Sequence, residues 1–359
     1  MYRFSTLFFV ILGLLCSSCA VHQKVGKPEH TAALISRIAF GSCGNPRKPE
    51  PVLDLAAVQK PDLFIWLGDN VYADTESADS LERRYRELDA RPEYQRLKKT
   101  CPFVATWDDH DYGWNDVGRH YPLKEASKEI FLNFFDVPKD DIRRTREGIY
   151  TSYIYTDAGH TVQVIVLDMR TFRDDLRPYR GEKIDTSRYN YELDYWPHDT
   201  ADSTLLGEKQ WKWLEKQLEQ PADLRIIASS SQFGITYNGY EAWANFPNEV
   251  ARMQSIIQKT QADGVVFISG DVHYAELSKL TCPKTYPLYD LTASGITSTW
   301  GFATPNDNRI EGPVMENHFG MLEIDWAKNT LLFKIIDVAG KTRINRQIKL
   351  SEICFGELD

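Results

Sequence analysis

The sequence predicts an α/β fold in which short buried strands alternate with amphipathic helices. The first observation is a set of apolar runs that end at Gly, Ser or Asp, as buried strands do where the chain turns sharply: 63–67, 103–107 and 264–268. The second is the helical spacing of apolar residues between these runs. The third is size, since 359 residues with 42% hydrophobic and 26% charged residues supply a core for one large α/β domain or two modest ones.

The N-terminal half alternates strand and helix. We expect strands at 34–40, 63–67 and 103–107, each an apolar run followed by polar residues. We expect a short helix at 51–59 and an amphipathic helix at 123–135. The charged stretch 80–99 has apolar residues loosely at helical spacing and is interpreted as helical. This alternation is the main support for the α/β class.

The second half begins with a hairpin formed by 148–159 and 161–167. Further strands and helices are expected in the order helix 208–220, strand 224–229, helix 250–259, strand 264–268, then antiparallel strands at 288–294, 321–325 and 330–338. The sequence contains no internal repeat and no interdomain linker. One domain over residues 34–350 is therefore the economical interpretation.

A long polar segment at 172–202 is rich in Asp, Arg and Tyr. Segments of this length without regular structure are usually functional or mobile in a compact domain. We interpret this insert as a candidate lid or specificity loop, although the sequence alone does not place it over a site.

The N-terminus has the pattern of an export signal. Arg3 is the only charged residue before the apolar run 7–15, which is followed by small residues and two cysteines. The run is too short to span a bilayer. It resembles a bacterial lipoprotein signal, so we expect a signal peptide at 1–18, a membrane-anchoring lipid at Cys19 and a tether at 19–33. The alternative is an ordinary secretory signal, and both interpretations predict an exported protein, periplasmic or at the cell surface.

Charge and cysteine content limit the classes of partner. A formal net charge of -9 argues against a nucleic-acid-binding surface, which gains affinity from basic side chains. No feature predicts a protein partner. Four cysteines follow the signal: Cys43, Cys101, Cys282 and Cys354. An oxidising compartment permits two disulfides, but three pairings are possible and none is predicted.

Polar residues with metal-binding or acid–base chemistry follow several predicted strands. They are Cys43, Asp69, Tyr72, Asp108, Asp109, His110, Gln232, Asp271 and His273. Loops that leave the carboxyl ends of strands in an open α/β sheet converge on one crevice, so one sheet can bring these residues to the same edge. Carboxylates gathered in a partly buried crevice repel one another and lose solvation, and bound cations resolve that conflict.

The mixed chemistry of this set indicates two kinds of metal ion. Carboxylates suit hard ions such as Ca²⁺, whereas thiolate, phenolate and imidazole suit a transition metal. A two-metal site holds its ions close enough to clamp a phosphoryl group between attacking and leaving oxygens. The sequence therefore predicts a binuclear site that binds a phosphate group without a basic surface.

Four motifs in this order resemble the alkaline phosphatase D (PhoD-like) family of metallophosphatases and phosphodiesterases. They are Gly41-Ser42-Cys43, Gly68-Asp69-Asn70-Val71-Tyr72, Trp107-Asp108-Asp109-His110-Asp111 and Ser269-Gly270-Asp271-Val272-His273. The resemblance extends over residues 35–300. It implies a four-layer α/β/β/α sandwich of two mixed sheets, a ferric ion (Fe³⁺), one or two Ca²⁺ ions, and hydrolysis of phosphate mono- or diesters.

The resemblance also implies a role for each ligand. Cys43, Asp69, Tyr72 and His273 would hold the iron. Asp69 would bridge to calcium, which Asp109 and Asp271 would also hold, with Asp108 as the alternative to Asp109. Asp271 stands where the wider superfamily has a histidine, and a carboxylate there fits a harder ion.

His110 is the candidate catalytic residue beside Asp109, in the position of the wider superfamily's Asn-His pair. It would stabilise the transition state or protonate the leaving group. Three further polar residues are candidates for contacts with the substrate: Asn115, Arg119 and Gln232.

The function that fits these residues is that of an exported, metal-dependent phosphoesterase. A phosphodiesterase of phospholipase or teichoic-acid type is an alternative within enzymes. A surface binding protein that kept the fold and lost turnover is the alternative from another class. The intact set of carboxylates argues against the binding protein, because a site without turnover has no need to hold repelling charges together.

Overall fold

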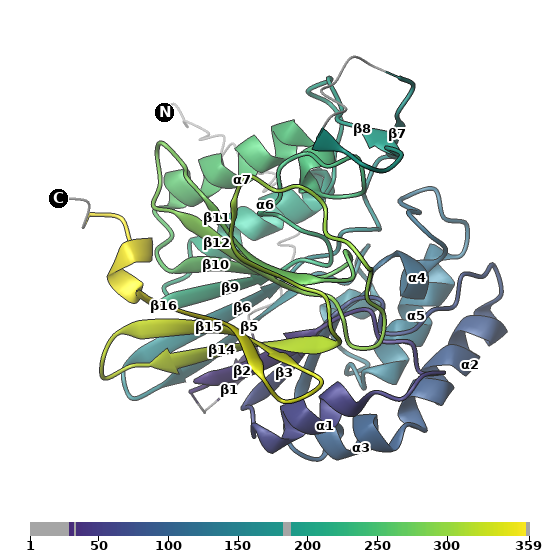
Figure 1. The fold of residues 1–359 in the computed structure, drawn as a ribbon, viewed down its shortest axis with the longest axis horizontal. Helices are drawn as coiled ribbons and strands as arrows, with labels where there is room; N and C mark the ends of the chain where they lie inside the picture. The colour runs from purple at the N-terminus through teal and green to yellow at the C-terminus, as the bar shows by residue number, and fades with distance from the viewer. Residues whose placement is uncertain (1–28, 32–33, 182–187, 357–359) are drawn as a thin grey trace, which may run out of the picture.

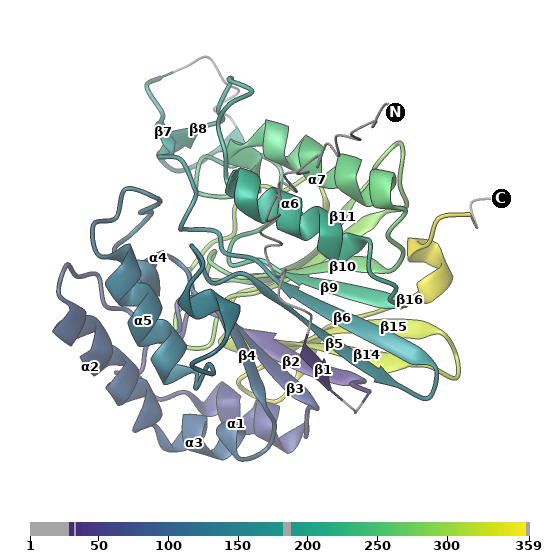
Figure 2. The same ribbon diagram turned by 180° about the vertical axis from the view of Figure 1, so that it is seen from behind.

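The computed structural model describes residues 29–31, 34–181 and 188–356 as two large sheets packed face to face, with helices on both outer faces (Figure 1, Figure 2). This is a four-layer α/β/β/α sandwich, and it confirms the predicted fold class. The predicted signal peptide and the anchor at Cys19 lie outside the described residues. None of the helices in these ranges is long and apolar enough to cross a membrane.

One sheet has six strands in the order β16-β15-β14-β2-β3-β4. Their bounds are β2 Arg37–Gly41, β3 Leu63–Leu67, β4 Phe103–Thr106, β14 His318–Asp325, β15 Thr330–Asp337 and β16 Thr342–Lys349. Strands β2, β3 and β4 are parallel neighbours, so their carboxyl ends share one edge. The outer face is covered by α1 (Pro51–Val58), α2 (Ala78–Asp89), α3 (Pro92–Lys98) and α5 (Lys124–Phe134) (Figure 1).

The second sheet has eight strands in the order β1-β5-β6-β9-β10-β12-β11-β13. Their bounds are β1 Glu29–Thr31, β5 Thr151–Asp157, β6 His160–Val166, β9 Leu224–Ala228, β10 Val265–Ser269, β11 Ala275–Leu280, β12 Leu288–Ala293 and β13 Arg309–Val314. Strands β6, β9, β10 and β12 are parallel neighbours. Helices α6 (Gly207–Leu218) and α7 (Pro247–Thr260) cover the outer face (Figure 2).

Strand β3 shows how one strand fills two hydrophobic layers. Leu63, Ile65 and Leu67 belong to the core that joins the two sheets, whereas Phe64 and Trp66 pack with residues of the covering helices. Successive side chains of a strand point to opposite faces, so burial on both faces requires a continuous apolar run. All five side chains are fully buried. The strand is therefore a rigid base for the loop that follows it.

Two expectations about the N-terminal half need correction. The stretch 80–99 forms two helices because Pro92, which lacks a backbone N–H, begins α3. The predicted tether 19–33 includes part of the fold, since Glu29–Thr31 form β1 and pair in parallel with β5. Backbone pairing along an edge strand needs no apolar pattern, so the sequence carries no signal for it.

The C-terminal half contains three strands that were not predicted, namely β11, β13 and β16. Strand β16 lies at a sheet edge and exposes most of its side chains, so it lacks the alternating pattern of a half-buried strand. Strand β12 was predicted to be antiparallel; it pairs in parallel with β10 and antiparallel with β11. The other predicted strands and helices, including the hairpin β5–β6, are confirmed with small differences at their ends.

Shorter elements complete the described chain. A two-stranded sheet within the 172–202 insert pairs β7 (Arg177–Pro178) with β8 (Tyr195–Trp196). One short helix, α4 (Asp109–Tyr112), begins where β4 ends. Single 3-10 turns lie at Ile142–Arg144, Trp243–Asn245 and Leu350–Ile353.

Glu50, directly before α1, is a buried carboxylic acid whose two oxygens make no hydrogen bond within the described structure. Burial raises the pKa of Glu50 from its ordinary value of 4.5 to about 8. The folded protein therefore keeps the proton of Glu50 between about pH 4.5 and pH 8, while the unfolded chain loses it. Through this group, the free energy of unfolding falls as the pH rises across that window.

We expect Glu50→Gln to stabilise the protein at pH 8.5 and to have little effect at pH 5, because the amide is neutral at both. The gain at pH 8.5 should be on the order of a few kcal/mol, since one pKa unit corresponds to about 1.4 kcal/mol. Denaturant unfolding of wild type and variant at the two pH values measures it. An equal change at both would show that Glu50 is not protonated in the folded protein.

Candidate metal centre

The predicted site residues come from two sheets and not from one, which corrects the expectation of a single sheet edge. The loops after β2, β3 and β4 of the six-stranded sheet meet the loops after β9 and β10 of the eight-stranded sheet. Backbone hydrogen bonds join them: Gly44 N donates to Asp69 O (2.9 Å), and Ser42 N donates to Ala293 O at the end of β12 (3.1 Å). The facing sheets therefore act as the two halves of one site.

The backbone is unusual at this junction. Cys43, Asp69, Asp271 and His273 all have positive φ, at 59°, 49°, 77° and 57°, although none is glycine. Such conformations are uncommon outside glycine and cluster at functional sites. Gly68 precedes Asp69 with φ 94°, and a Cβ there would lie 2.5 Å from the Asp108 Cβ. The loops after β3 and β4 can approach this closely only because that side chain is absent.

The candidate iron ligands lie together around Cys43. Its Sγ lies 3.5 Å from Asp69 Oδ2 and 3.5 Å from the Asp271 carbonyl oxygen. No disulfide involves Cys43 in the described part of the chain. Burial and the nearby Asp69 carboxylate raise the pKa of the Cys43 thiol well above its ordinary value. Without a cation this arrangement favours the neutral thiol, and a bound metal ion would favour the thiolate.

Tyr72 and His273 complete this half of the site. The Tyr72 hydroxyl is buried and makes no hydrogen bond within the described structure, and burial followed by Asp69 raises its pKa well above the ordinary value. The Nδ1 atom of His273 lies 3.2 Å from the Ser298 carbonyl oxygen. A proton on Nδ1 donated to that carbonyl leaves Nε2 as the ligand atom, the arrangement common for metal-binding histidines.

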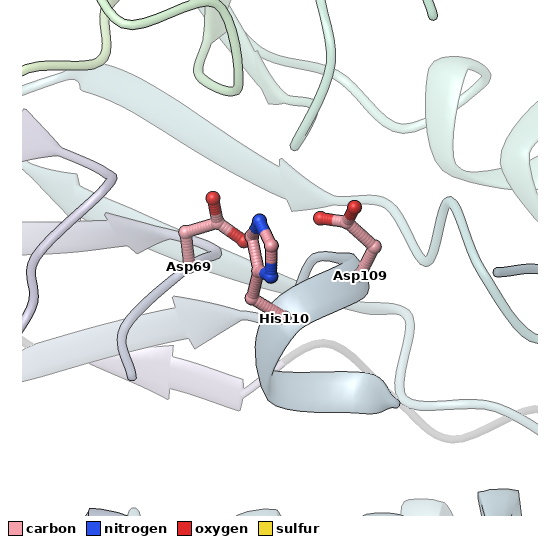
Figure 3. A group of neighbouring side chains, drawn as sticks. All are labelled: Asp69, Asp109 and His110. Atoms are coloured by element: carbon pink, nitrogen blue, oxygen red, sulfur yellow. The ribbon is translucent and has the colours of Figure 1, made fainter. Parts of the chain in front are cut away.

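The candidate calcium ligands are carboxylates with unsatisfied oxygens. Asp69 and Asp109, with His110, offer ligand atoms that all lie within 4.8 Å of one another, and so do Asp108, Asp109 and Asp271. Figure 3 shows the carboxylates of Asp69 and Asp109 on either side of the His110 ring. The atoms Asp69 Oδ1, Asp108 Oδ2 and Asp109 Oδ1 are buried without a hydrogen-bond partner. Buried orphan oxygens are costly alone and are what a hard cation would satisfy.

Asp109 is a better ligand candidate than Asp108. Asp109 belongs to both groups, and its Oδ2 accepts a backbone hydrogen bond from Asp116 N (2.6 Å), which orients Oδ1. Asp108 Oδ1 accepts hydrogen bonds from Arg170 Nε and Ser230 Oγ, both at 2.6 Å. One oxygen of Asp108 is therefore committed to the protein.

Arg170 is a central residue that the motifs did not identify. It is fully buried; its Nη1 donates to both Glu241 oxygens at 2.8 Å, and its Nη2 lies 3.7 Å from Asp109 Oδ1. Burial alone would raise the pKa of Asp109, but the Arg170 guanidinium and then His110 lower it to about 2. Arg170 thus keeps Asp109 ionised. The available signal was its position in the polar stretch Asp168-Met169-Arg170, which follows strand β6.

A second acidic group lies next to Asp109 and connects the site to the 172–202 insert. Asp109, Asp116 and Glu241 offer oxygens within 4.8 Å of one another. Tyr195 of β8 donates its hydroxyl proton to Asp116 Oδ2 at 2.5 Å. Burial raises the pKa of Asp116 to about 8. Asp116 and Glu241 were missed because they lie in irregular loops, but the insert is now placed at the edge of the site.

His110 is held beside the centre by a carboxylate outside it. Its Nδ1 lies 2.5 Å from Asp74 Oδ1, and its ring centroid lies 4.4 Å from that of Tyr72. Burial lowers the pKa of His110, but Asp69 and the hydrogen bond to Asp74 outweigh it, so the pKa rises to about 11. Without a bound cation these carboxylates favour the imidazolium form, whose second nitrogen, Nε2, is available to the centre.

The three predicted substrate contacts have different positions. Asn115 is exposed and donates to Asp116 Oδ2 (2.8 Å), which places it near the centre. Arg119 is exposed and forms an ion pair with Asp174 of the insert (2.6 Å). Gln232 is buried and donates to Glu276 and Thr292 within the eight-stranded sheet. These contacts orient the Gln232 amide nitrogen toward the sheet, and its contact with a substrate stays a prediction.

A sandwich of two mixed sheets with acidic, thiol, phenol and imidazole groups where their loops meet defines a metallophosphatase type of architecture. The chain belongs to the PhoD-like phosphatase family, whose sequence profile matches residues 39–317. It is 24% identical to alkaline phosphatase D of Bacillus subtilis (strain 168) over 266 residues, which are 62% of this chain and 43% of that protein. The match thus spans less than half of the length of that relative.

Solved structures agree on the fold. A structure of PhoD superposes with a TM-score of 0.68 at 18% identity and covers 90% of this chain and 73% of that one. GAP50, described as the anchor in the inner membrane complex of Plasmodium, superposes with a TM-score of 0.51 at 13% identity over 88% of each chain. Neither sequence identity is high enough to carry more than the architecture.

Proposed function

We propose that this protein is a metal-dependent phosphoesterase that hydrolyses phosphate mono- or diesters. The observation that carries the proposal is a pair of acidic groups that share Asp109, one with Asp69 and one with Asp271. In them Asp69 Oδ1 and Asp109 Oδ1 are buried and have no hydrogen-bond partner among the described residues. Family membership supports the same reaction class. The site is anionic, so it can bind a phosphate group only through cations that lie between the carboxylates and the phosphate.

The donor set fits two kinds of ion, Fe³⁺ and Ca²⁺. Cys43, Tyr72 and His273 supply the sulfur, phenol and imidazole atoms that suit iron. The Cys43 side chain and the Tyr72 hydroxyl are buried, and the Ser298 carbonyl oxygen orients the His273 ring through Nδ1. Asp109 and Asp271 supply the carboxylates that suit calcium, with Asp69 between the two groups. When bound, the ions would supply Lewis acidity toward the phosphoryl oxygens and toward the attacking water.

The protein's own groups provide the rest of the chemistry. His110, protonated and oriented by Asp74, can donate a proton to the leaving oxygen or a hydrogen bond to a phosphoryl oxygen. Arg170 keeps Asp109 ionised and occupies one oxygen of Asp108, so the carboxylates hold fixed positions before substrate binds. The site is therefore organised in advance for charge that develops in the transition state.

Metal analysis with two chromogenic substrates tests the proposal. We expect purified protein to contain iron and calcium, to hydrolyse 4-nitrophenyl phosphate or bis(4-nitrophenyl) phosphate, and to lose activity on chelation. A phenolate bound to Fe³⁺ absorbs visible light, so the protein should be coloured. Tyr72→Phe should remove the band, whereas Tyr94→Phe, a buried control under the helices, should keep it.

The outcomes separate the alternatives. A colourless, iron-free protein with full activity would contradict the iron assignment alone. A metal-loaded protein that hydrolyses neither substrate would contradict the proposed phosphoesterase activity and favour the alternative of a binding protein. The ratio of the two rates shows whether monoesters or diesters are preferred.

A further inference from the structure

Four aromatic side chains form a connected surface that begins at the candidate ligand His273. This aromatic surface consists of Tyr191, Tyr240, Trp300 and Phe302. The Trp300 ring lies 5.2 Å from the rings of both His273 and Tyr240, and it stacks on Phe302 at 5.3 Å with an interplanar angle of 11°. Tyr191 closes the set at 5.1 Å from Tyr240 and 5.5 Å from Phe302.

The surface is assembled from separate parts of the chain and held in place by the backbone. Tyr191 belongs to the 172–202 insert, and its hydroxyl donates to the Asn238 carbonyl oxygen (2.7 Å). Trp300 N donates to the His273 carbonyl oxygen (3.0 Å), which ties the ring to the metal centre. The rings are thus fixed before any ligand binds, and little conformational entropy remains to be lost.

The surface is open to solvent. Phe302 is 38% exposed, and Tyr191, Tyr240 and Trp300 are each half-buried. The indole N–H of Trp300 donates to no atom of the described residues. It is also not buried, so it faces solvent. Single exposed aromatics are ordinary on protein surfaces, but a contiguous set beside a polar centre marks a site of interaction.

We propose that the aromatic surface binds a planar ring carried by the phosphate ester, so that phosphate esters of aromatic or heterocyclic alcohols are the favoured substrate class; this inference rests on the proposed function. The surface offers ring faces and no exposed aliphatic side chain, which favours stacking over the burial of an acyl chain. It starts at His273, so a ring one ester linkage from the bound phosphorus would reach it. The four side chains carry no charge, which suits a neutral ring.

Binding of phosphonates, which carry a stable P–C bond, tests this without turnover. Benzylphosphonate and cyclohexylmethylphosphonate have six ring carbons each and a CH₂ group in place of the ester oxygen, but only the phenyl ring is planar. We expect the metal-loaded full-length protein to bind benzylphosphonate roughly 10-fold more tightly than cyclohexylmethylphosphonate or methylphosphonate in calorimetry, within the range that stacking on aromatic side chains provides.

Variants locate the effect. Phe302→Leu should reduce the phenyl-to-cyclohexyl ratio severalfold and leave methylphosphonate affinity unchanged, whereas Phe302→Tyr should preserve the ratio. Trp300→Leu should also reduce the ratio severalfold. The matched control is Trp326→Leu, because Trp326 stacks on His160 and donates to Ser36, at the opposite end of the sheets. That control should keep the wild-type ratio.

Two outcomes overturn the inference in distinguishable ways. Equal affinity for phenyl and cyclohexyl groups, in a protein that hydrolyses chromogenic esters, would leave the proposed function standing and remove the stacking subsite. A metal-loaded protein that neither hydrolyses esters nor binds any of the three phosphonates would remove the proposed function and the subsite with it.

Discussion

Replacing Asp69 with asparagine should abolish binding of at least one metal ion and reduce turnover by about 100-fold or more. Asp69 is the residue that connects the two halves of the centre, with Oδ2 near the Cys43 thiol and Oδ1 buried without a partner. The amide keeps the size and tolerates the left-handed backbone, so the change removes charge and little else. The expected loss is on the scale of removing one main electrostatic contributor to a transition state.

Asp271→Asn should behave in the same way, because Asp271 offers a ligand oxygen within 4.8 Å of those of Asp108 and Asp109. Asp290→Asn is the control: Asp290 is a buried aspartate that accepts hydrogen bonds from Phe233 N and Gly234 N and belongs to none of the metal-binding groups of the described residues. That control should keep its metals. Elemental analysis and steady-state rates measure the effect, and full metal occupancy with wild-type turnover in Asp69→Asn would refute the bridging role.

His110→Ala should lower kcat by roughly 100- to 10,000-fold on esters with poor leaving groups, the usual range for a general acid. The loss should be smaller for nitrophenyl esters, whose leaving group needs little protonation. Metal content and KM should change little, because the imidazole acts as charge develops and not in binding. Rates over a series of alkyl and aryl esters measure the dependence on the leaving group.

The chain offers a matched control for this change. His120 also pairs with a carboxylate, since its Nδ1 lies 3.0 Å from Asp175 Oδ2, but it is exposed on the surface. His120→Ala should leave kcat and its leaving-group dependence unchanged. An equal loss across the series in His110→Ala would limit His110 to stabilising a phosphoryl oxygen. An intact kcat with a lowered Tm would make His110 a structural residue.

The strand-end motifs located most of the candidate centre because parallel strands carry a local signal. The run 63–67 is apolar since both faces are buried, and Asp69 follows it directly, so the ligand and its position can both be read from one stretch. The same holds for Asp108 and Asp109 after β4 and for Asp271 after β10. That two sheets meet at this edge is not local information, and residue spacing could not predict it.

The residues that were missed act through contacts between distant segments. Arg170 contacts Asp108, 62 positions away, and Glu241, 71 positions away. No pattern within either loop requires the other. Gln232 also follows a strand, as the candidate ligands do, but its side-chain nitrogen donates inward to Glu276 and Thr292. The position of a polar residue directly after a strand therefore predicts that the residue lies near the edge of the sheet. It does not predict which way the side chain points.

The left-handed backbone at Cys43, Asp69, Asp271 and His273 limits which amino acids can occupy these four positions. In the proposed centre each position supplies a ligand atom and must also tolerate positive φ. Aspartate and histidine meet both demands, since they are among the residues enriched in that conformation. Cysteine is not enriched there, so Cys43 is the one residue of the four whose backbone conformation is unusual for its residue type. In the proposed centre, the thiol's role as a ligand favours cysteine at position 43, and the backbone conformation does not.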